Sequence, residues 1–259
     1  MNRARVEERS ERRVAEALAA SIQGMLGNDL VGIYLSGSMV TGGFDPGVSD
    51  LDLVVVTAIE ADRIDLAGLE RMHREFVQQR PDWSDRIEAV YIGHRTLRSF
   101  RTSTDRLAVI SPGEPLHLRD DAAMLWLQNW YLIRETGLAL AGPAASEIVP
   151  AIRWREFVDA TTRYARDLST RIEGEVSSGG LAYALLTICR AYMTARTDRH
   201  VSKHEAAALV SELVPESAWL IEAALRARSS RGTTGFDDSR TQAAARELIR
   251  ILVTEMGVT

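Results

Sequence analysis

The chain has 259 residues, of which 46% are hydrophobic and 26% are charged, and this balance predicts a soluble protein of one or two domains with a buried core. Its formal net charge is −5 and it contains no basic block, which disfavours a polynucleotide partner. No apolar run is long enough to cross a membrane, the N-terminus lacks the apolar segment of a signal peptide, and the single cysteine, Cys189, cannot form an internal disulfide. We therefore expect a cytoplasmic monomer that binds neither nucleic acid nor membrane, with Cys189 as a buried, inert thiol.

The first 150 residues mix helical and extended patterns. Apolar residues recur at helical spacing in some segments, and short apolar runs next to glycine, proline and aspartate mark strands in others. In chain order, we predict a helix over 6–25, strands over 31–36 and 49–56, a helix over 61–78, a strand over 86–92, a loop-rich wall of a cleft over 94–121, and a helix over 122–138. Gly142-Pro143 then breaks the chain near a domain boundary.

The remaining residues are almost wholly helical in pattern. Residues 181–195 are apolar on nearly every side, as expected for the central helix of a bundle. Residues 177–180 are predicted to end the helix before it. The predicted helices of this part cover 154–172, 181–195, a segment opening at 203, and 239–255.

Gly37 and Ser38 follow the first predicted strand. A glycine allows the backbone to come close to an anion, and N–H groups at the start of a following helix can hold a polyphosphate together with the Ser38 hydroxyl. Glycine followed by serine is common in proteins, so this dipeptide alone is a weak signal of phosphate binding.

Asp50 and Asp52 stand at the start of the second predicted strand. Side chains alternate between the two faces of a strand, so both carboxylates point to the same side. Such a pair is typical of Mg²⁺ sites that leave coordination positions for substrate phosphates, and two ions in one site would lie about 3.5–4 Å apart. The alternative is an exposed turn before a strand. The order of the two motifs, with Gly42-Gly43 between them, favours phosphate chemistry.

Glu88 interrupts the third predicted strand, which is otherwise apolar. It alternates with Ile87 and Ala89, and a charge at such a position needs a reason. If this strand lies beside the second one, Glu88 would come near Asp50 and Asp52 and complete a cluster of three carboxylates. The alternative is a solvent-facing glutamate on an edge strand.

Two cations stand out in the helical part. Arg190 is the one charged residue within 181–195, so its guanidinium should pair with a carboxylate or with a ligand phosphate. Ser202 and Glu205 predict a capping box, which places Lys203 in a first helical turn, where the helix dipole disfavours a cation. A bound polyphosphate would relieve that conflict, whereas the alternative is a solvated surface lysine.

The first block of motifs resembles the signature of the polymerase-beta-like nucleotidyltransferases, and its residues are Gly37, Ser38, Gly42, Gly43, Pro46 and Ser49-Asp50-Leu51-Asp52. Within that superfamily the chain resembles, over nearly its full length, the aminoglycoside adenylyltransferases of the streptomycin and spectinomycin type. The later matching stretches are 87–92, 134–135, 141–145, 186–190 and Lys203.

This resemblance implies an α/β (α+β) nucleotidyltransferase domain with a small mixed sheet over 1–150, followed by an all-α helical bundle over 151–259, with the active site in the cleft between them. The implied reaction is Mg²⁺-dependent transfer of AMP from ATP to a hydroxyl group of an aminoglycoside or aminocyclitol antibiotic, with release of pyrophosphate. The resemblance implies that Glu88 is the general base and that Asp50 and Asp52 bind two metal ions. The residues implied to bind the nucleotide are Gly37, Ser38, Arg190 and Lys203.

Two other functions remain open on the residues alone. One is a catalytically silent nucleotide-binding or antitoxin-type module, against which the intact acidic set argues. The other is an adenylyltransferase with a non-antibiotic acceptor, such as a protein or tRNA hydroxyl. The absence of a basic block disfavours tRNA.

The sequence departs from the streptomycin-modifying relatives where those enzymes carry a tryptophan, acidic residues and a tyrosine near their ligands. The corresponding positions here lie near Leu107, at the neutral residues 177–180, and near Ala227. Without fixed anions, streptomycin would lose charge-assisted hydrogen bonds of about 1.5–3 kcal/mol each. We therefore expect spectinomycin or an unrelated small hydroxyl compound to be preferred over streptomycin, although Glu173 and Glu175 are close enough in sequence to supply the missing charge.

Overall fold

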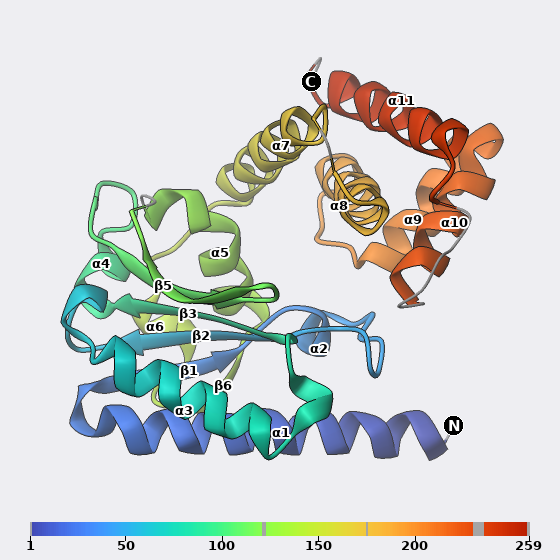
Figure 1. The fold of residues 1–259 in the computed structure, drawn as a ribbon. Coiled ribbons are helices and arrows are strands. Elements are labelled where there is room, and N and C mark those ends of the chain that lie inside the picture. The colour runs from blue at the N-terminus through green and yellow to red at the C-terminus, as the bar shows by residue number, and fades with distance from the viewer. Residues whose placement is uncertain (1, 121–122, 175, 230–235, 258–259) are drawn as a thin grey trace. The chain divides into compact units, whose positions relative to one another are not determined.

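The computed structural model of the protein describes residues 2–120, 123–174, 176–229 and 236–257 (Figure 1). The chain divides into two compact units, Met1–Ile152 and Arg153–Thr259. None of the described helices is both long enough and apolar enough to cross a membrane.

The first unit is built around a six-stranded mixed sheet, as predicted, with strand order β5-β4-β3-β2-β1-β6. Strands β2 and β3 run parallel, and every other neighbouring pair is antiparallel. The strands are β1 (Leu30–Leu35), β2 (Leu51–Thr57), β3 (Ile87–Gly93), β4 (Leu107–Ser111), β5 (Glu114–Arg119) and β6 (Leu138–Ala141). The three predicted strands correspond to β1, β2 and β3.

Helices α1 (Asn2–Leu26) and α3 (Leu66–Gln78) cover one face of this sheet (Figure 1). Leu18 of α1 and Leu69 of α3 are completely buried there, in a cluster that also contains Leu53 of β2 and Ala89 of β3. Helix α5 (Leu127–Thr136) lies on the other side of the sheet, and the short helices of this unit are α2 (Ser38–Thr41), α4 (His94–Arg98) and α6 (Ala145–Ile148). The sheet is therefore held between two apolar layers.

Residues 94–121 were expected to be irregular, and that prediction is wrong. They contain α4 and then the antiparallel hairpin of β4 and β5. Ser111 pairs with Glu114, so Pro112 and Gly113 form a two-residue turn, and Gly113 adopts a positive φ of 79°. The sequence pattern does not reveal this hairpin, because both strands are short and only β4 is buried.

Two predicted helices have different limits in the structure. The helix predicted over 61–78 begins only at Leu66, because the Asp65 side chain accepts a hydrogen bond from the Gly68 N–H at 3.0 Å and caps the helix there. The helix predicted over 122–138 ends at Thr136, and 138–141 form β6 beside β1.

The second unit is a helical bundle of α7 (Trp154–Arg171), α8 (Ser178–Thr197), α9 (Lys203–Leu213), α10 (Ala218–Ser229) and α11 (Ser239–Glu255). Helix α8 contacts each of the other four, which confirms its predicted central place. It begins earlier than expected, because Ser177 caps it by accepting a hydrogen bond from the Gly180 N–H at 3.1 Å. Residues 178–180 therefore belong to α8.

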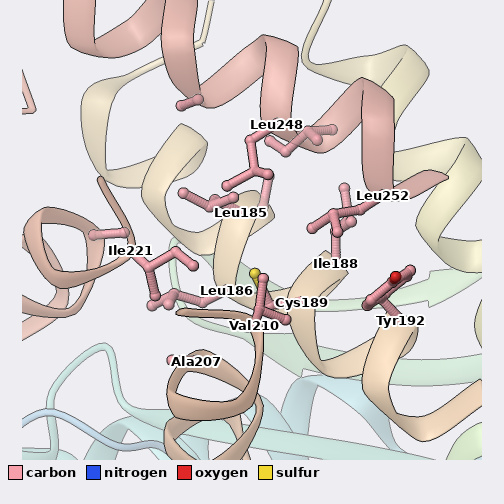
Figure 2. Packing of buried hydrophobic residues seen from close by; sticks show 14 of the residues in the cluster. Leu185, Leu186, Ile188, Cys189, Tyr192, Ala207, Val210, Ile221, Leu248 and Leu252 are labelled. Carbon is pink, nitrogen blue, oxygen red and sulfur yellow. The ribbon is translucent and has the colours of Figure 1, made fainter. Parts of the chain in front are cut away.

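Figure 2 shows the core around α8, where Leu185 and Ile188 face Leu248 and Leu252 of α11. Cys189 is completely buried in the same cluster. Burial raises the pKa of its thiol to about 12, which disfavours the reactive thiolate, and the predicted burial of Cys189 is confirmed.

Candidate active site

Three segments of the first unit converge at one end of the sheet. Strands β1 and β2 are antiparallel, so the end of β1 lies beside the beginning of β2, where the Ser36 N–H donates to the Asp52 carbonyl at 2.9 Å. Strand β3 is parallel to β2, so its first residues lie at the same end. The topology therefore brings Gly37, Asp52 and Glu88 together, as the order of motifs predicts.

Asp52 and Glu88 are directly opposite each other in the parallel register of β2 and β3. Neighbouring strands lie about 4.7–4.9 Å apart, so the two half-buried side chains stand next to each other. Leu53 and Ala89 point to the other face, into the core beneath α1 and α3. This register confirms the predicted neighbourhood of Glu88 and Asp52.

Gly37 lies against the Asp52 carboxylate. A Cβ atom at position 37 would be only 1.8 Å from Asp52 Oδ2, and the glycine has a positive φ of 64°. Both facts require glycine at this position. The Gly37 carbonyl then accepts bonds from the Thr41 N–H at 3.0 Å and the Thr41 hydroxyl at 2.9 Å, which closes the single turn of α2 after Ser38.

The donor set fits a hard divalent cation. Asp52 and Glu88 present carboxylate oxygens side by side, and two such ligands leave positions for phosphate oxygens and water. Within the described part of the chain, however, no group of three or more His, Cys, Asp or Glu side chains could hold a metal ion. The register brings two of the three expected carboxylates together, and the place of Asp50 beside them stays a prediction. Asp50 precedes the first ladder residue of β2, so its direction depends on the loop before the strand and not on the sheet register.

Arg86, which sequence reasoning missed, connects that loop to β3. Its guanidinium donates to the Ser49 carbonyl from Nε at 3.1 Å and from Nη2 at 2.6 Å, and to the Asp82 carbonyl from Nη1 at 3.1 Å. The guanidinium carbon also lies 4.3 Å from the centroid of the Trp83 ring. The one sequence signal for Arg86 is a lone arginine two positions before Glu88.

In the second unit, Lys203 opens α9 and is held against an aromatic ring. Its Nζ lies 4.2 Å from the ring centroid of Tyr183 on α8, a cation–π contact. Ser202 caps α9 as predicted, accepting a hydrogen bond from the Glu205 N–H at 3.1 Å, while the Glu205 carboxylate forms an ion pair with Arg199.

Arg190 lies two helical turns beyond Tyr183, on the same side of α8. It is half-buried, and among the described residues no carboxylate pairs with it. Burial, together with the charge of Arg190, lowers the pKa of His200 to about 4, so that histidine adds no charge at neutral pH. Arg190 and Lys203 thus provide two cations on one side of the second unit.

The positions expected to shape the substrate site have varied environments. Leu107 is completely buried in β4, so it contributes to the core and does not line a binding wall. Glu173 is exposed at the end of α7, and Ala227 is half-buried in α10. Glu175 lies outside the described residues.

Two family models match the chain. The nucleotidyltransferase domain matches residues 20–104, which include β1, β2 and β3, and the C-terminal domain of aminoglycoside adenylyltransferase matches residues 147–255, which include α7 to α11. No curated protein matches the chain in sequence.

Among solved structures, the spectinomycin adenyltransferase AAD(9) from Enterococcus faecialis, crystallised with ATP and spectinomycin, is similar in fold with a TM-score of 0.69 at 19% identity, over 91% of this chain and 98% of that one. The STING-associated CdnE c-di-GMP synthase from Capnocytophaga granulosa aligns at 12% identity over 97% of this chain and 82% of that one, with a TM-score of 0.36. The two family matches show that the chain is a nucleotidyltransferase that carries, after its nucleotidyltransferase domain, the C-terminal domain of the aminoglycoside adenylyltransferases.

Proposed function

We propose that this enzyme transfers AMP from ATP to a hydroxyl group of an aminocyclitol antibiotic and releases pyrophosphate. The observation that carries the proposal is the in-register pair of Asp52 and Glu88, placed at the same end of the sheet as Gly37 and Ser38. This pair can serve a metal and a proton acceptor at once, which is what nucleotidyl transfer requires.

Glu88 accepts the proton of the acceptor hydroxyl while that oxygen attacks the α-phosphorus of ATP. The bond from the α-phosphorus to the bridging oxygen breaks, and pyrophosphate leaves with the electron pair. Asp52 and Asp50 would hold Mg²⁺, as one or two ions. The metal would supply charge neutralisation and orientation of the ATP phosphates.

Arg190 and Lys203 are assigned to the phosphates of ATP, with Ser38 and the backbone of Gly37. The assignment of Arg190 is supported by its half-burial and by the absence of a carboxylate partner among the described residues. That of Lys203 is supported by its place in the first turn of α9, where a polyphosphate offsets the unfavourable helix dipole. The Tyr183 ring limits the orientations open to the lysine.

The preferred acceptor is expected to be spectinomycin. Residues 177–180 carry no charge and form the capped start of α8, so they offer no anion to the guanidinium groups of streptomycin. Steady-state comparison of the two drugs at saturating ATP tests this preference. A higher kcat/KM for streptomycin would show that anions come from elsewhere, Glu173 being one candidate.

Pyrophosphate release tests the proposed reaction itself. The protein is incubated with labelled ATP, Mg²⁺ and a panel of aminocyclitols and aminoglycosides, and the AMP-modified product is identified by mass. Binding of ATP without pyrophosphate from any acceptor would indicate a silent nucleotide-binding module. Label on a protein or tRNA would indicate a different acceptor class.

Gly37→Ala is expected to lower kcat by about 10²-fold, the usual result of moving a reacting group by about 1 Å. The added Cβ would overlap the Asp52 carboxylate, which must then leave its position. Pyrophosphate release measures the effect. Gly113→Ala is the matched control, because Gly113 has a similar positive φ of 79° but an added Cβ would meet nothing within 4 Å. Equal losses in both variants would show that backbone strain, and not the displacement of Asp52, is responsible.

A further inference from the structure

We infer that Arg86 is a positioning residue of the nucleotidyl-transfer site, which holds the backbone on both sides of Asp50 and so directs that carboxylate. The consequence for catalysis rests on the proposed function. The restraint on the backbone rests only on the hydrogen bonds of Arg86.

The guanidinium of Arg86 is set in a closed environment. The residue is 4% exposed, and an arginine remains charged at any physiological pH, so its burial is costly unless its N–H groups have acceptors. Two of them converge on the Ser49 carbonyl and one reaches the Asp82 carbonyl, while the Trp83 ring covers the guanidinium plane. A rigid, planar group held in this way fixes the carbonyl that it binds.

Asp50 is the residue that this arrangement encloses. On its N-terminal side, the Ser49 carbonyl is bound by the Arg86 guanidinium, and on its C-terminal side, the Leu51 N–H donates to the Arg86 carbonyl at 2.8 Å. Both flanking peptide groups of Asp50 are therefore tied to one residue. The sheet ladder cannot do this alone, because it begins at Leu51.

The preceding loop is closed independently. The Ser49 N–H donates to the Asp45 carbonyl at 2.9 Å, and the Asp45 N–H donates to the Ser49 hydroxyl at 2.9 Å. These bonds shape residues 45–49 as one turn but do not tie that turn to the strand that carries Glu88. Arg86 makes that connection, because it stands two positions before Glu88. We therefore assign to it the relative placement of Asp50 and Glu88.

The test uses the full-length protein with three substitutions. Arg86→Met removes the donors but keeps an apolar stem for the Trp83 ring, and Arg86→Lys keeps the charge but offers a single nitrogen in place of the planar fork. Arg80→Met is the matched control, because the Arg80 guanidinium also stacks at 4.3 Å on an aromatic ring, that of Phe76. Hydrogen exchange, pyrophosphate release and the dependence of rate on Mg²⁺ concentration are measured for each.

In both Arg86 variants, amide exchange within residues 45–52 is expected to rise by about tenfold to a hundredfold, the worth of one charge-assisted hydrogen bond. The kcat value falls by about 10–10²-fold, half-saturation moves to higher Mg²⁺ concentration, and KM for ATP stays within a few-fold. Arg80→Met leaves exchange in residues 45–52, kcat and the Mg²⁺ dependence unchanged.

The inference would be overturned if amide exchange within residues 45–52 of Arg86→Lys were as slow as in the wild type. It would also be overturned if Arg86→Met and Arg80→Met lost kcat equally. If Arg86→Met exchanges rapidly throughout the first unit, it is unfolded, and Arg86→Lys then decides. If the wild-type protein releases no pyrophosphate, the proposed function fails. The exchange comparison still decides whether Arg86 restrains the segment around Asp50.

Discussion

Replacing Glu88 by glutamine is expected to lower kcat by about 10²–10⁴-fold while the affinity for ATP changes only a few-fold. Glutamine has the size of glutamate but cannot accept the proton of the attacking hydroxyl. Glu88 and Asp52 are opposite each other in strands that pair through their backbones, so a change of the Glu88 side chain leaves the register intact. Single-turnover formation of the AMP-modified acceptor measures the chemical step, and calorimetry measures ATP binding.

A role in metal binding would have a different signature. If Glu88 were mainly a metal ligand, Glu88→Gln would shift the Mg²⁺ dependence of the rate, and excess Mg²⁺ would restore part of the activity. Glu70→Gln on the exposed side of α3 is the control for the loss of one carboxylate in the same unit. A kcat close to that of the wild type in Glu88→Gln would exclude the general-base assignment.

The convergence of Gly37, Asp52 and Glu88 could be predicted because it depends on local rules. Alternation within a strand fixes which side chains share a face, and a polar residue in an apolar strand marks the face that is not core. The register could not be predicted in the same way. That Asp52 stands opposite Glu88 depends on how β2 and β3 slide along each other, and this is set by packing of both strands against α1 and α3.

Sequence reasoning missed short strands and a side chain that donates hydrogen bonds to backbone carbonyl groups. The hairpin of β4 and β5 has strands too short for a clear period, and its turn, Pro112-Gly113, was interpreted as part of a loop. Arg86 has no sequence pattern that reveals its partners, because they are backbone carbonyls contributed by the loop and turn around it. Such contacts are visible only once the chain is folded.

Arg134 is a second residue whose role the sequence does not reveal. It lies in a stretch that matches the family, yet its guanidinium donates to the carbonyls of Ser146 at 2.6 Å and Val149 at 2.5 Å. These bonds satisfy carbonyl groups at the end of α6, next to the boundary of the first unit. A residue shared with a family can therefore serve the fold, and a residue outside the motifs, such as Arg86, can serve the site.

Asp52→Asn is expected to abolish measurable Mg²⁺-dependent turnover, with a loss on the order of 10³-fold or more, because removing a metal ligand forfeits several kcal/mol of transition-state charge stabilisation. Asparagine has the same size, so the close contact with Gly37 and the strand pairing remain, and the midpoint of urea unfolding should move little. Asp29→Asn, an exposed acid-to-amide change in the same unit, is the control.

The metal assignment can be separated from catalysis by measuring binding of Mn²⁺ in the presence of a non-hydrolysable ATP analogue, by paramagnetic resonance or calorimetry. We expect the analogue and the protein carboxylates to bind the ion together in the wild type. In Asp52→Asn the protein contribution is expected to be lost, so that the affinity of the ternary complex falls toward that of the free nucleotide. The Asp50 side chain is directed by Arg86 and not by the sheet ladder. If both aspartates are metal ligands, Asp50→Asn should show the same loss of affinity. Undiminished binding in both variants would refute the metal site, and a loss in Asp52→Asn alone would restrict it to the pair that the register places side by side.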